Sequence, residues 1–584
     1  MQKLPQCINL NEKQKVQDRL FVPSRGVTLK EGLLKTVFDN NIGFLKTLDL
    51  DAMLYWFRKR AGKPAPGVPY HGHFEDNIKG QTAGLFLMGA GNTLRWHKEE
   101  ELEKIMNEIV DCIDACRDSD GYLMAISKDD FGTRENPHYV RIWLNYGLIA
   151  AAMGGNGKAY QILREWQDWF NQCDDLPIIR YTELSFQGIV ASTAAYNTPV
   201  GKWDDMEVAI KYYQEDWRLG QFIGKERDAI HIRRQPGYEP HPHGTELESF
   251  EGYLDLYRAT GKKYYLRAVL NAYDLYKEDW QHVGGGIVMC EHDNTYPKSY
   301  WISPRKKYNE FCCTAFWIQL NQRLHRLFPD EEKYVNEIEA SLYNIAVADQ
   351  DGTEGIRYFA ILDQHKTKSG KVTCCCGVGT KVYGTLPEYL YSVAEDGVYV
   401  DIYAASQFNW EKGDHTVTLD VDTKMPYDEN VSIKISMPGT DTFKLRLRIP
   451  AWVVSEVEIS INGKEKYVGS AGSYCEIERT WENGDVITFR LPMAFRIKEY
   501  SGADDVLGYD RYSFEYGPIL MAIKGEVDHD TCVYIDEKIE QHEKWLLPGD
   551  RPLAFRIKSR PDQEIIPYFE IQDERFTCFP LFKK

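Results

Sequence analysis

The spacing of apolar residues changes near residue 395, and this change constrains the fold more than any other feature of the chain. Before it, apolar residues recur at the three- and four-residue intervals of an amphipathic helix. This spacing covers residues 34–57, 100–116, 140–153, 159–171, 204–219, 246–258, 263–279, 311–327 and 331–348. After it, short runs alternate with period two, as half-buried strands do. These runs are 398–402, 417–421, 431–435 and 443–449. The sequence therefore predicts a helical body followed by a β-rich region.

A chain of 584 residues is long enough for several domains. Roughly a dozen helices in succession, separated by Gly, Pro and Asn, favour a helical toroid, an (α/α) barrel. Short strands with tight-turn dipeptides, such as Asn462-Gly463 and Asn483-Gly484, favour a β-sandwich. We therefore expect a multidomain α + β protein. Its expected parts are an N-terminal arm or strand associated with the β region (1–30), a barrel that forms the catalytic domain (31–395), a β-sandwich (396–498) and a C-terminal β domain (499–584).

Five of the thirteen cysteines fall in two short clusters late in the helical region. The first is Glu310-Phe311-Cys312-Cys313, and the second is Cys374-Cys375-Cys376. Adjacent cysteines do not readily bridge each other, because a disulfide needs a specific Cα and Cβ geometry. Thiolates and a carboxylate are instead good ligands for a borderline-soft ion such as Zn²⁺. Spacing alone leaves three interpretations open: a closed structural zinc site, a group of buried thiols without metal, and a site in which one thiolate is also a nucleophile.

Four other residues have side chains suited to sugar chemistry, and each has a plainer alternative. Gly284-Gly285-Gly286 leads to Glu291, which suits either a carboxylate in a pocket or a solvated loop. His243 precedes a predicted helix and suits a sugar hydroxyl or a helix cap. Glu183 opens a predicted helix, where the helix dipole favours a carboxylate in any case. Glu339 lies on a predicted helix, where an ordinary surface charge is the alternative.

The charge of the chain limits its partners. A formal net charge of −18 argues against nucleic acid and against an anionic membrane surface. The chain carries 14 tryptophans, 37 tyrosines and 25 phenylalanines, the residue type that covers sugar rings. No window of about 18 apolar residues predicts a transmembrane helix, and the stretch Met1–Pro5 lacks the apolar core of a signal peptide. We expect a cytoplasmic protein that binds a glycoside or oligosaccharide; a homodimer is left open.

Together these residues resemble glycoside hydrolase family 127, the β-L-arabinofuranosidase-like proteins that were formerly a family of unknown function. The similarity spans nearly the whole chain, and its most specific part is Glu310-x-Cys312 combined with Cys374-Cys375. Further matching segments are Gly121-Tyr122-Leu123, His243 with Glu251-Gly252, 257–261, 342–344, 389–391, 447–452, Arg479-x-Trp481 with Gly484-Asp485, and 516–518.

The resemblance implies an (α/α)₆ barrel followed by β-sandwich domains. It also implies a retaining exo-glycosidase for β-L-arabinofuranosides or a related plant-glycan sugar. The implied Zn²⁺ ligands are Glu310, Cys312, Cys374 and Cys375. The implied nucleophile is Cys374, with the neighbouring Cys375 as the alternative, and the implied acid/base is a glutamate between the Gly-rich loop and Glu310, which is Glu291 here. The candidate substrate-binding residues are His243, Glu183 and Glu339.

Such chemistry is physically reasonable. A thiolate replaces the usual carboxylate nucleophile once its pKa is lowered, and Zn²⁺ lowers it. The sugar is less certain, because Gly80–Gly84 stands where characterised members tend to carry histidines. Two alternatives remain: a non-catalytic carbohydrate-binding protein with a structural zinc, and a polysaccharide lyase on an (α/α) toroid, which would use a Tyr or His base.

Overall fold

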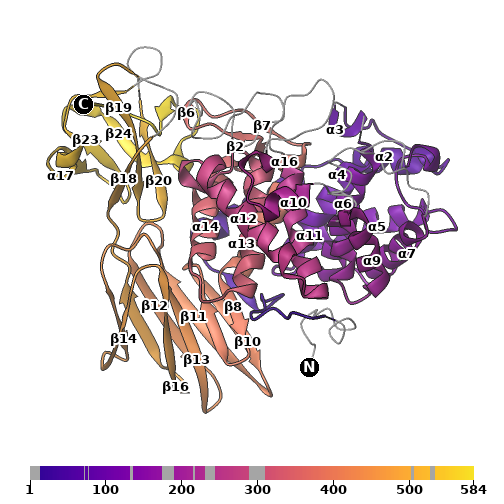
Figure 1. Cartoon of the computed structure of the whole chain (residues 1–584), viewed down its shortest axis with the longest axis horizontal. Coiled ribbons are helices and arrows are strands. Elements are labelled where there is room, and N and C mark those ends of the chain that lie inside the picture. The colour runs from indigo at the N-terminus through magenta and orange to yellow at the C-terminus, as the bar shows by residue number, and fades with distance from the viewer. Residues whose placement is uncertain are drawn as a thin grey trace.

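The computed structural model describes residues 14–71, 73–76, 78–131, 136–173, 190–214, 218–230, 244–288, 309–500, 506–525 and 533–584. Helices gather in one half of the molecule and sheets in the other (Figure 1). The mixed multidomain class predicted from the change of period is therefore confirmed. No helix within these ranges combines the length and apolar character that a membrane crossing requires.

The helices of the N-terminal half keep the labels of Figure 1. They are α1 Leu33–Leu45, α2 Leu50–Arg60, α3 His73–Asp76, α4 Gln81–Leu94, α5 Glu100–Ala115, α6 Asn136–Met153, α7 Ala159–Asn171, α9 Trp203–Gln214, α10 Arg218–Ile223, α11 Gly244–Thr260, α12 Lys263–Leu275, α13 Phe311–Leu327, α14 Lys333–Ser341, α15 Val347–Asp349 and α16 Cys374–Gly384. A π-helical turn, η5 Leu342–Ala346, separates α14 from α15.

The predicted helix 34–57 is in fact two helices, α1 and α2. The carboxylate of Asp49 accepts a hydrogen bond from the backbone N–H of Ala52 (3.0 Å) and caps the second helix. The spacing of apolar residues did not predict α4 and α16, which contain three glycines each. Glycine has a low helix propensity, but here it lets helix backbones approach closely. A Cβ on Gly377 would lie 2.4 Å from Leu85, and one on Gly91 would lie 2.2 Å from the backbone of Ala150.

Five of the described helices, α4, α6, α11, α13 and α16, run parallel to one another. Where two of these helices touch, the residue numbers of the contacting residues rise together in both helices. The contacting pairs are Gly84 with Trp143, Gly91 with Ala150, Leu85 with Gly377, Gly89 with Thr380, Gly244 with Cys312, Glu251 with Arg323, Cys312 with Cys375, and Gln319 with Lys381. The N-termini of these helices therefore lie at the same end of the helical region.

The middle of the chain forms two sheets. The seven-stranded sheet has the order β1-β10-β11-β12-β17-β14-β15, and the four-stranded sheet has the order β16-β13-β9-β8. The strands are β1 Val27–Leu29, β8 Tyr391–Ala394, β9 Gly397–Val400, β10 Ser406–Lys412, β11 His415–Thr423, β12 Asn430–Ser436, β13 Thr440–Ile449, β14 Val457–Ile461, β15 Glu465–Gly469, β16 Ser473–Glu482 and β17 Val486–Arg490. β1 reaches this region from before the helices and pairs antiparallel with β10, Val27 opposite Phe408.

A ten-stranded sheet closes the chain. It contains β18 Phe495–Glu499, β19 Tyr509–Tyr516, β20 Ile519–Lys524, β21 Tyr534–Ile535, β22 Leu546–Pro548, β23 Phe555–Ile557, β24 Arg560–Pro567, β25 Phe576–Thr577, β26 Leu581–Lys583 and β6 Asp363–Gln364. Short strands also join the segments ahead of α13 and α16. They are β2 Asn309–Glu310, paired with β5 Phe359–Ala360, and the sheet of β3 Gln350–Asp351, β4 Gly355–Arg357 and β7 Ser369–Gly370.

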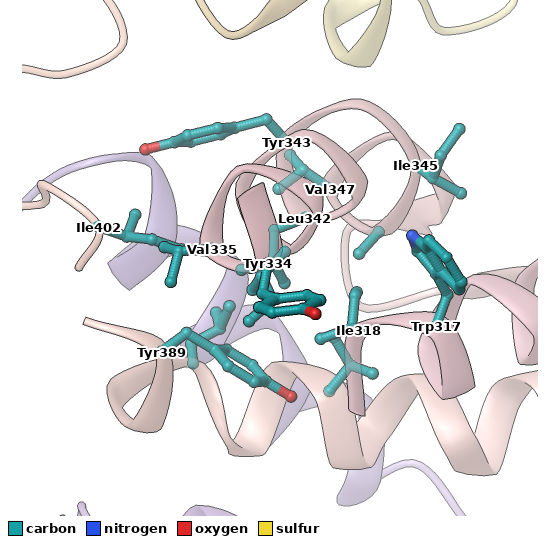
Figure 2. Close-up of a cluster of buried hydrophobic side chains, with 14 of the residues drawn as sticks. Trp317, Ile318, Tyr334, Val335, Leu342, Tyr343, Ile345, Val347, Tyr389 and Ile402 are labelled. Carbon is teal, nitrogen blue, oxygen red and sulfur yellow. The ribbon is translucent and has the colours of Figure 1, made fainter. Parts of the chain in front are cut away.

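A buried apolar cluster joins the helical half to the β-rich half. Figure 2 shows Trp317 and Ile318 of α13 near Tyr334 and Val335 of α14, with Ile402 from the β-rich half beside them. A second junction is polar: the guanidinium of Arg448 in β13 donates to Glu332 (2.7 Å) and to Glu339 of α14 (3.0 Å). These buried contacts fix the β-rich half against α14.

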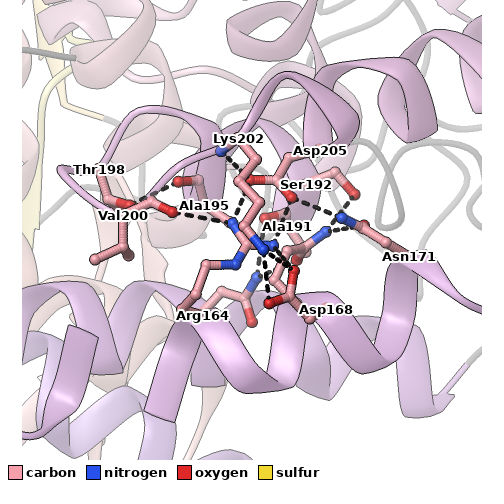
Figure 3. A network of polar contacts seen from close by, with 12 residues as sticks. Arg164, Asp168, Asn171, Ala191, Ser192, Ala195, Thr198, Val200, Lys202 and Asp205 are labelled. Carbon is pink, nitrogen blue, oxygen red and sulfur yellow. Dashed lines mark hydrogen bonds and ion pairs between the residues drawn. The ribbon is translucent and has the colours of Figure 1, made fainter. Parts of the chain in front are cut away.

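On the far side of the helical half, a polar network ties α7 to α9 (Figure 3). Arg164 pairs with the fully buried carboxylate of Asp205 at 2.7 Å, and Asn171 donates to the same carboxylate at 2.7 Å. Lys202 pairs with Asp168 at 2.8 Å. The buried charge of Asp205 is thus balanced within the network.

Candidate functional site

The two cysteine clusters converge on one buried point. Glu310, Cys312, Cys374 and Cys375 each place a ligand atom within 4.8 Å of the others, and all four side chains are buried. The Sγ atoms of Cys312 and Cys375 lie 3.1 Å apart, and Cys375 Sγ lies 3.9 Å from Glu310 Oε1. These are the residues that the sequence identified as candidate metal ligands, and the group has the donor types and the compactness to hold a metal ion.

Local backbone structure explains why these residues meet. Glu310 ends β2 with extended dihedral angles, and α13 begins at the next residue. Thr373 is the N-cap of α16, and its hydroxyl accepts a hydrogen bond from the backbone N–H of Cys376 (3.1 Å). Cys312, Cys374 and Cys375 therefore lie in the first turns of parallel helices. The positive end of each helix dipole favours negative charge there, which suits thiolates.

The electrostatics of the cluster limit how many of its groups can carry a negative charge. Burial raises the pKa of the Cys375 thiol well above its ordinary value, and the neighbouring Cys312 and Cys374 raise it further. Burial likewise raises the pKa of Cys312 well above its ordinary value, with Cys374 as the next cause. Three thiols and a carboxylate this close cannot all ionise unless a positive charge lies among them. The donor set therefore fits a divalent ion bound by thiolates.

The third cysteine of the triplet faces elsewhere. Cys376 Sγ accepts from the Thr373 hydroxyl (3.0 Å) and lies 3.1 Å from the carbonyl oxygen of Gly370. Burial raises the pKa of Cys376 to about 11. Cys374, by contrast, retains 5 % exposure and lies 3.6 Å from the hydroxyl of Tyr358. Cys374 and Cys375, rather than Cys375 and Cys376, therefore belong to the cluster with Glu310 and Cys312.

One neighbour of the cluster, and one residue at the level where α16 begins, were not among the predicted site residues. Tyr358 lies between β4 and β5, in a segment whose sequence has no distinctive motif. Gln81 begins α4, and neither its amide nitrogen nor its amide oxygen has a partner among the described residues, although the side chain is fully buried. Leu85, one turn further along α4, contacts Gly377 of α16, so Gln81 lies level with the residues at which α16 begins. In the sequence, Gly80–Gly84 differs from the family pattern, and this difference was the signal that could have identified Gln81.

Further along α11, α13 and α16, on the C-terminal side of the cluster, ionisable side chains lie where these helices face one another. Arg323 pairs with Glu251 at 2.8 Å, and Lys381 donates to Gln319 at 2.6 Å. Glu248, one turn after Gly244, is fully buried, and neither carboxyl oxygen has a partner among the described residues. Burial raises the pKa of Glu248 well above its ordinary value, and the neighbouring charge of Glu251 raises it further.

The structure does not bring Glu339 to the cluster. Its Oε2 atom accepts hydrogen bonds from the indole of Trp452 (2.7 Å) and from Arg448 (3.0 Å). Glu339 is 2 % exposed, so the surface-charge interpretation is wrong. The predicted acid/base Glu291 and the candidate substrate contacts His243 and Glu183 lie outside the described residues.

Comparison with known proteins points to one family. The profile described as "Beta-L-arabinofuranosidase, GH127 catalytic domain" matches residues 26–388, and the profile of the GH127 middle domain matches residues 397–493. The cluster lies within the first match. A non-reducing end β-L-arabinofuranosidase of Bifidobacterium longum is 20 % identical over an alignment of 459 residues, and the match covers 65 % of each chain. This chain thus aligns with just under two thirds of the length of that relative.

Solved structures agree on the fold. A GH127 β-L-arabinofuranosidase from Geobacillus stearothermophilus T6 superposes with a TM-score of 0.73 at 18 % identity, covering 95 % of this chain and 100 % of that one. A second GH127 β-arabinofuranosidase gives a TM-score of 0.75 at 17 % identity, covering 97 % and 98 %. At such identities the likeness concerns the fold.

Proposed function

This chain belongs to glycoside hydrolase family 127, and from that premise we propose that it is a retaining exo-glycosidase that uses a cysteine thiolate as nucleophile. We propose a β-L-arabinofuranoside, or a related sugar of a plant glycan, as its substrate. The observation that carries the proposal is the convergence of Glu310, Cys312, Cys374 and Cys375 at the N-termini of parallel helices, inside the region that matches the catalytic domain.

The proposed metal is Zn²⁺, because three thiolates and one carboxylate complete a tetrahedral set for this ion. Glu310, Cys312, Cys374 and Cys375 would hold it. When bound, Zn²⁺ would lower the pKa of the thiols and make a sulfur–sugar bond easier to break.

Cys374 is the proposed nucleophile. Its sulfur attacks the anomeric carbon while the bond from that carbon to the leaving oxygen breaks, which gives a glycosyl–cysteine intermediate. Water then attacks the same carbon, the C–S bond breaks, and the second inversion restores the original configuration. Among the three clustered thiols, Cys374 is the most exposed, and the Tyr358 hydroxyl 3.6 Å away can donate a hydrogen bond to its thiolate. Tyr358 would thereby orient the attacking sulfur.

Glu291 is the proposed acid/base, because it lies between the Gly-rich segment 284–286 and Glu310 in the sequence. It would protonate the leaving oxygen in the first step and take a proton from water in the second. His243 and Glu183 are the proposed substrate contacts, joined by Gln81, whose buried amide has no partner in the described part of the chain and suits a sugar hydroxyl. We assign Glu339 to the junction with β13 instead.

The finer architecture that goes with this function is an (α/α)₆ barrel over about 31–395, with a β-sandwich at 396–498 and a C-terminal β domain at 499–584. The five parallel helices are consistent with the inner ring of such a barrel, since a barrel of this type gathers the N-termini of its inner helices at one end. The acidic net charge of −18 fits a neutral glycoside better than a nucleic acid or an anionic membrane.

The test is a panel of nitrophenyl glycosides, β-L-arabinofuranoside included, assayed on the same preparation in which zinc is measured. We expect turnover by the wild type and none by Cys374→Ser, since a serine hydroxyl is a far poorer nucleophile at neutral pH. Cys376→Ser is the matched control and should retain activity. A Cys374→Ser protein that still turns over substrate would leave only the structural role for the cluster. Saccharide binding without any turnover would favour a non-catalytic carbohydrate-binding protein, and an unsaturated, ultraviolet-absorbing product would favour a lyase.

A further inference from the structure

A crevice of about 530 Å³ lies between the seven-stranded sheet and the C-terminal sheet. One wall comes from the loop that precedes β12, with Tyr427 and Glu429, and from Arg490 at the end of β17. The other wall comes from Tyr516 at the end of β19 and Phe555 at the start of β23. Figure 1 shows β12 in the middle region and β19 and β23 in the C-terminal region. The crevice contains none of the residues that we assign to catalysis, and its volume is typical of a site for a small ligand.

Aromatic rings form the wall on the side of the C-terminal sheet. The ring centroids of Tyr516 and Phe555 lie 4.9 Å apart, and Phe495 lies 4.9 Å from the first and 4.6 Å from the second. All three side chains are half-buried, so part of this ring cluster faces water. The face of an aromatic ring is a suitable surface for the C–H groups on one side of a sugar.

Charged groups form the wall on the side of the seven-stranded sheet. Glu429 pairs with Arg490, while its other oxygen accepts from the backbone N–H of Met493 (2.8 Å). The Arg490 side chain is 67 % exposed, whereas that of Glu429 is 14 % exposed, so most of the guanidinium remains open to the crevice. A carboxylate beside a guanidinium offers acceptors and donors together, which neighbouring hydroxyls on a sugar can satisfy in pairs.

The walls are held in place before any ligand arrives. The Tyr427 hydroxyl donates to Glu570 Oε1 at 3.3 Å, which links this wall to the C-terminal region. Asp428 accepts from both the backbone and the side chain of Asn430 at 2.7 Å, and so fixes the loop. A preorganised site loses less conformational entropy on binding.

The charges narrow the choice of ligand. Asp428 and Glu429 oppose a polyanion, and Arg490 opposes a cation, so a neutral polar molecule with an apolar face is the ligand that fits best. We propose that this crevice is a second saccharide-binding site, which holds a neutral oligosaccharide segment of the glycan that the catalytic site trims. The identity of that glycan rests on the proposed function, whereas the existence of the site rests on the crevice itself.

The experiment is affinity electrophoresis in native gels that contain soluble branched arabinan or arabinoxylan, with polygalacturonate gels as the anionic comparison. The protein is the full chain carrying Cys374→Ser, so that the polysaccharide is not consumed.

We expect retardation in the neutral gels and none in polygalacturonate. Tyr516→Ala should weaken the neutral interaction by about tenfold, since it removes a stacking ring. Arg490→Ala, a change at an exposed position, should weaken it as well without affecting folding. Free arabinose should compete only weakly if the site holds several sugar units.

Matched controls make the outcome decisive. Tyr467→Ala removes a half-buried tyrosine from β15 of the seven-stranded sheet, and Arg556→Ala removes a half-buried arginine beside Phe555; neither residue lines the crevice. Both controls should migrate like the parent. In the Cys374-containing enzyme, Tyr516→Ala should leave turnover of nitrophenyl glycosides unchanged. Equal retardation of parent and Tyr516→Ala, or no retardation in any neutral gel, would overturn the second site. Retardation that depends on Tyr516 in an enzyme without glycosidase activity would instead overturn the proposed function and leave the site standing.

Discussion

The Sγ atoms of Cys312 and Cys375 lie 3.1 Å apart, although the two residues are separated by 63 positions in the sequence. The distance is too long for a disulfide, whose sulfurs are about 2.05 Å apart. It is also too short for two buried thiolates that lack a balancing cation. The pair therefore exists either as neutral thiols or as thiolates around a metal.

We predict about one Zn²⁺ per chain, bound by these two cysteines together with Glu310 and Cys374. Chelation should lower the midpoint of thermal unfolding, because metal bound only by the folded state stabilises it. Cys375→Ser should lose most of the zinc, whereas Cys376→Ser should keep it. Elemental analysis and thermal scans on the same samples check this. Zinc-free wild-type protein, purified without chelator and fully active, would contradict it.

Glu291→Gln should slow hydrolysis of natural glycosides by about 10²–10⁴-fold, because the leaving oxygen would lose its proton donor. Nitrophenyl glycosides need less protonation and should suffer less in the first step. Steady-state rates with the two classes of substrate give the comparison. If both classes slow equally little, the acid/base role belongs to another carboxylate.

Tyr358→Phe should lower kcat by about tenfold or more, because a hydrogen bond to a charged group contributes about 1.5–3 kcal/mol. Zinc content should stay the same, since Tyr358 is not among the proposed ligands. Tyr403→Phe is the matched control, because its hydroxyl donates to the carbonyl of Arg448 (2.7 Å) in the β-rich half. Equal kinetics for Tyr358→Phe and the wild type would remove Tyr358 from the site.

Arg448→Ala should destabilise the protein by about 3–5 kcal/mol, because it removes the positive charge that balances the buried carboxylates of Glu332 and Glu339. Glu339→Gln should be milder and should leave KM unchanged, since Glu339 contacts the β-rich half rather than the thiol cluster. Denaturant unfolding and steady-state kinetics measure the two effects. A large rise in KM with normal stability would return Glu339 to the substrate site.

His138 should make the helical half sensitive to acid. Burial lowers its pKa from 6.5 to about 3. Between those values the unfolded chain binds a proton that the folded chain does not, so stability falls as pH falls from about 6.5 toward 3. The slope is at most about 1.4 kcal/mol per pH unit. His138→Phe keeps an aromatic ring against Phe131 and should flatten this part of the profile, which thermal scans at several pH values would show. Identical profiles for the two proteins would contradict the prediction.

Sequence patterns predicted best where the signal was local. Apolar spacing placed a helix at 311–327, where α13 lies, and the Glu310-x-Cys312 and Cys374-Cys375 spacings identified the residues that converge. Spacing failed for α4 and α16, because their glycines serve contacts with other helices, and those contacts are invisible in a single segment. Tyr358 and the partner of Glu339 were missed for the same reason. Each depends on a side chain that is distant in sequence, Cys374 in one case and Arg448 in the other.

The pairing of β1 with β10 has a consequence for synthesis of the chain. Val27 leaves the ribosome long before its partner Phe408, and at about 5–20 residues per second the delay is about 20–80 s. During that time the whole helical half can fold, while the N-terminal strand stays unpaired. The edge of the seven-stranded sheet is therefore completed only when β1, which is synthesised early, pairs with β10, which is synthesised much later. A protein that lacks residues 27–29 would expose the edge of β10, and such an edge is a template for association between chains.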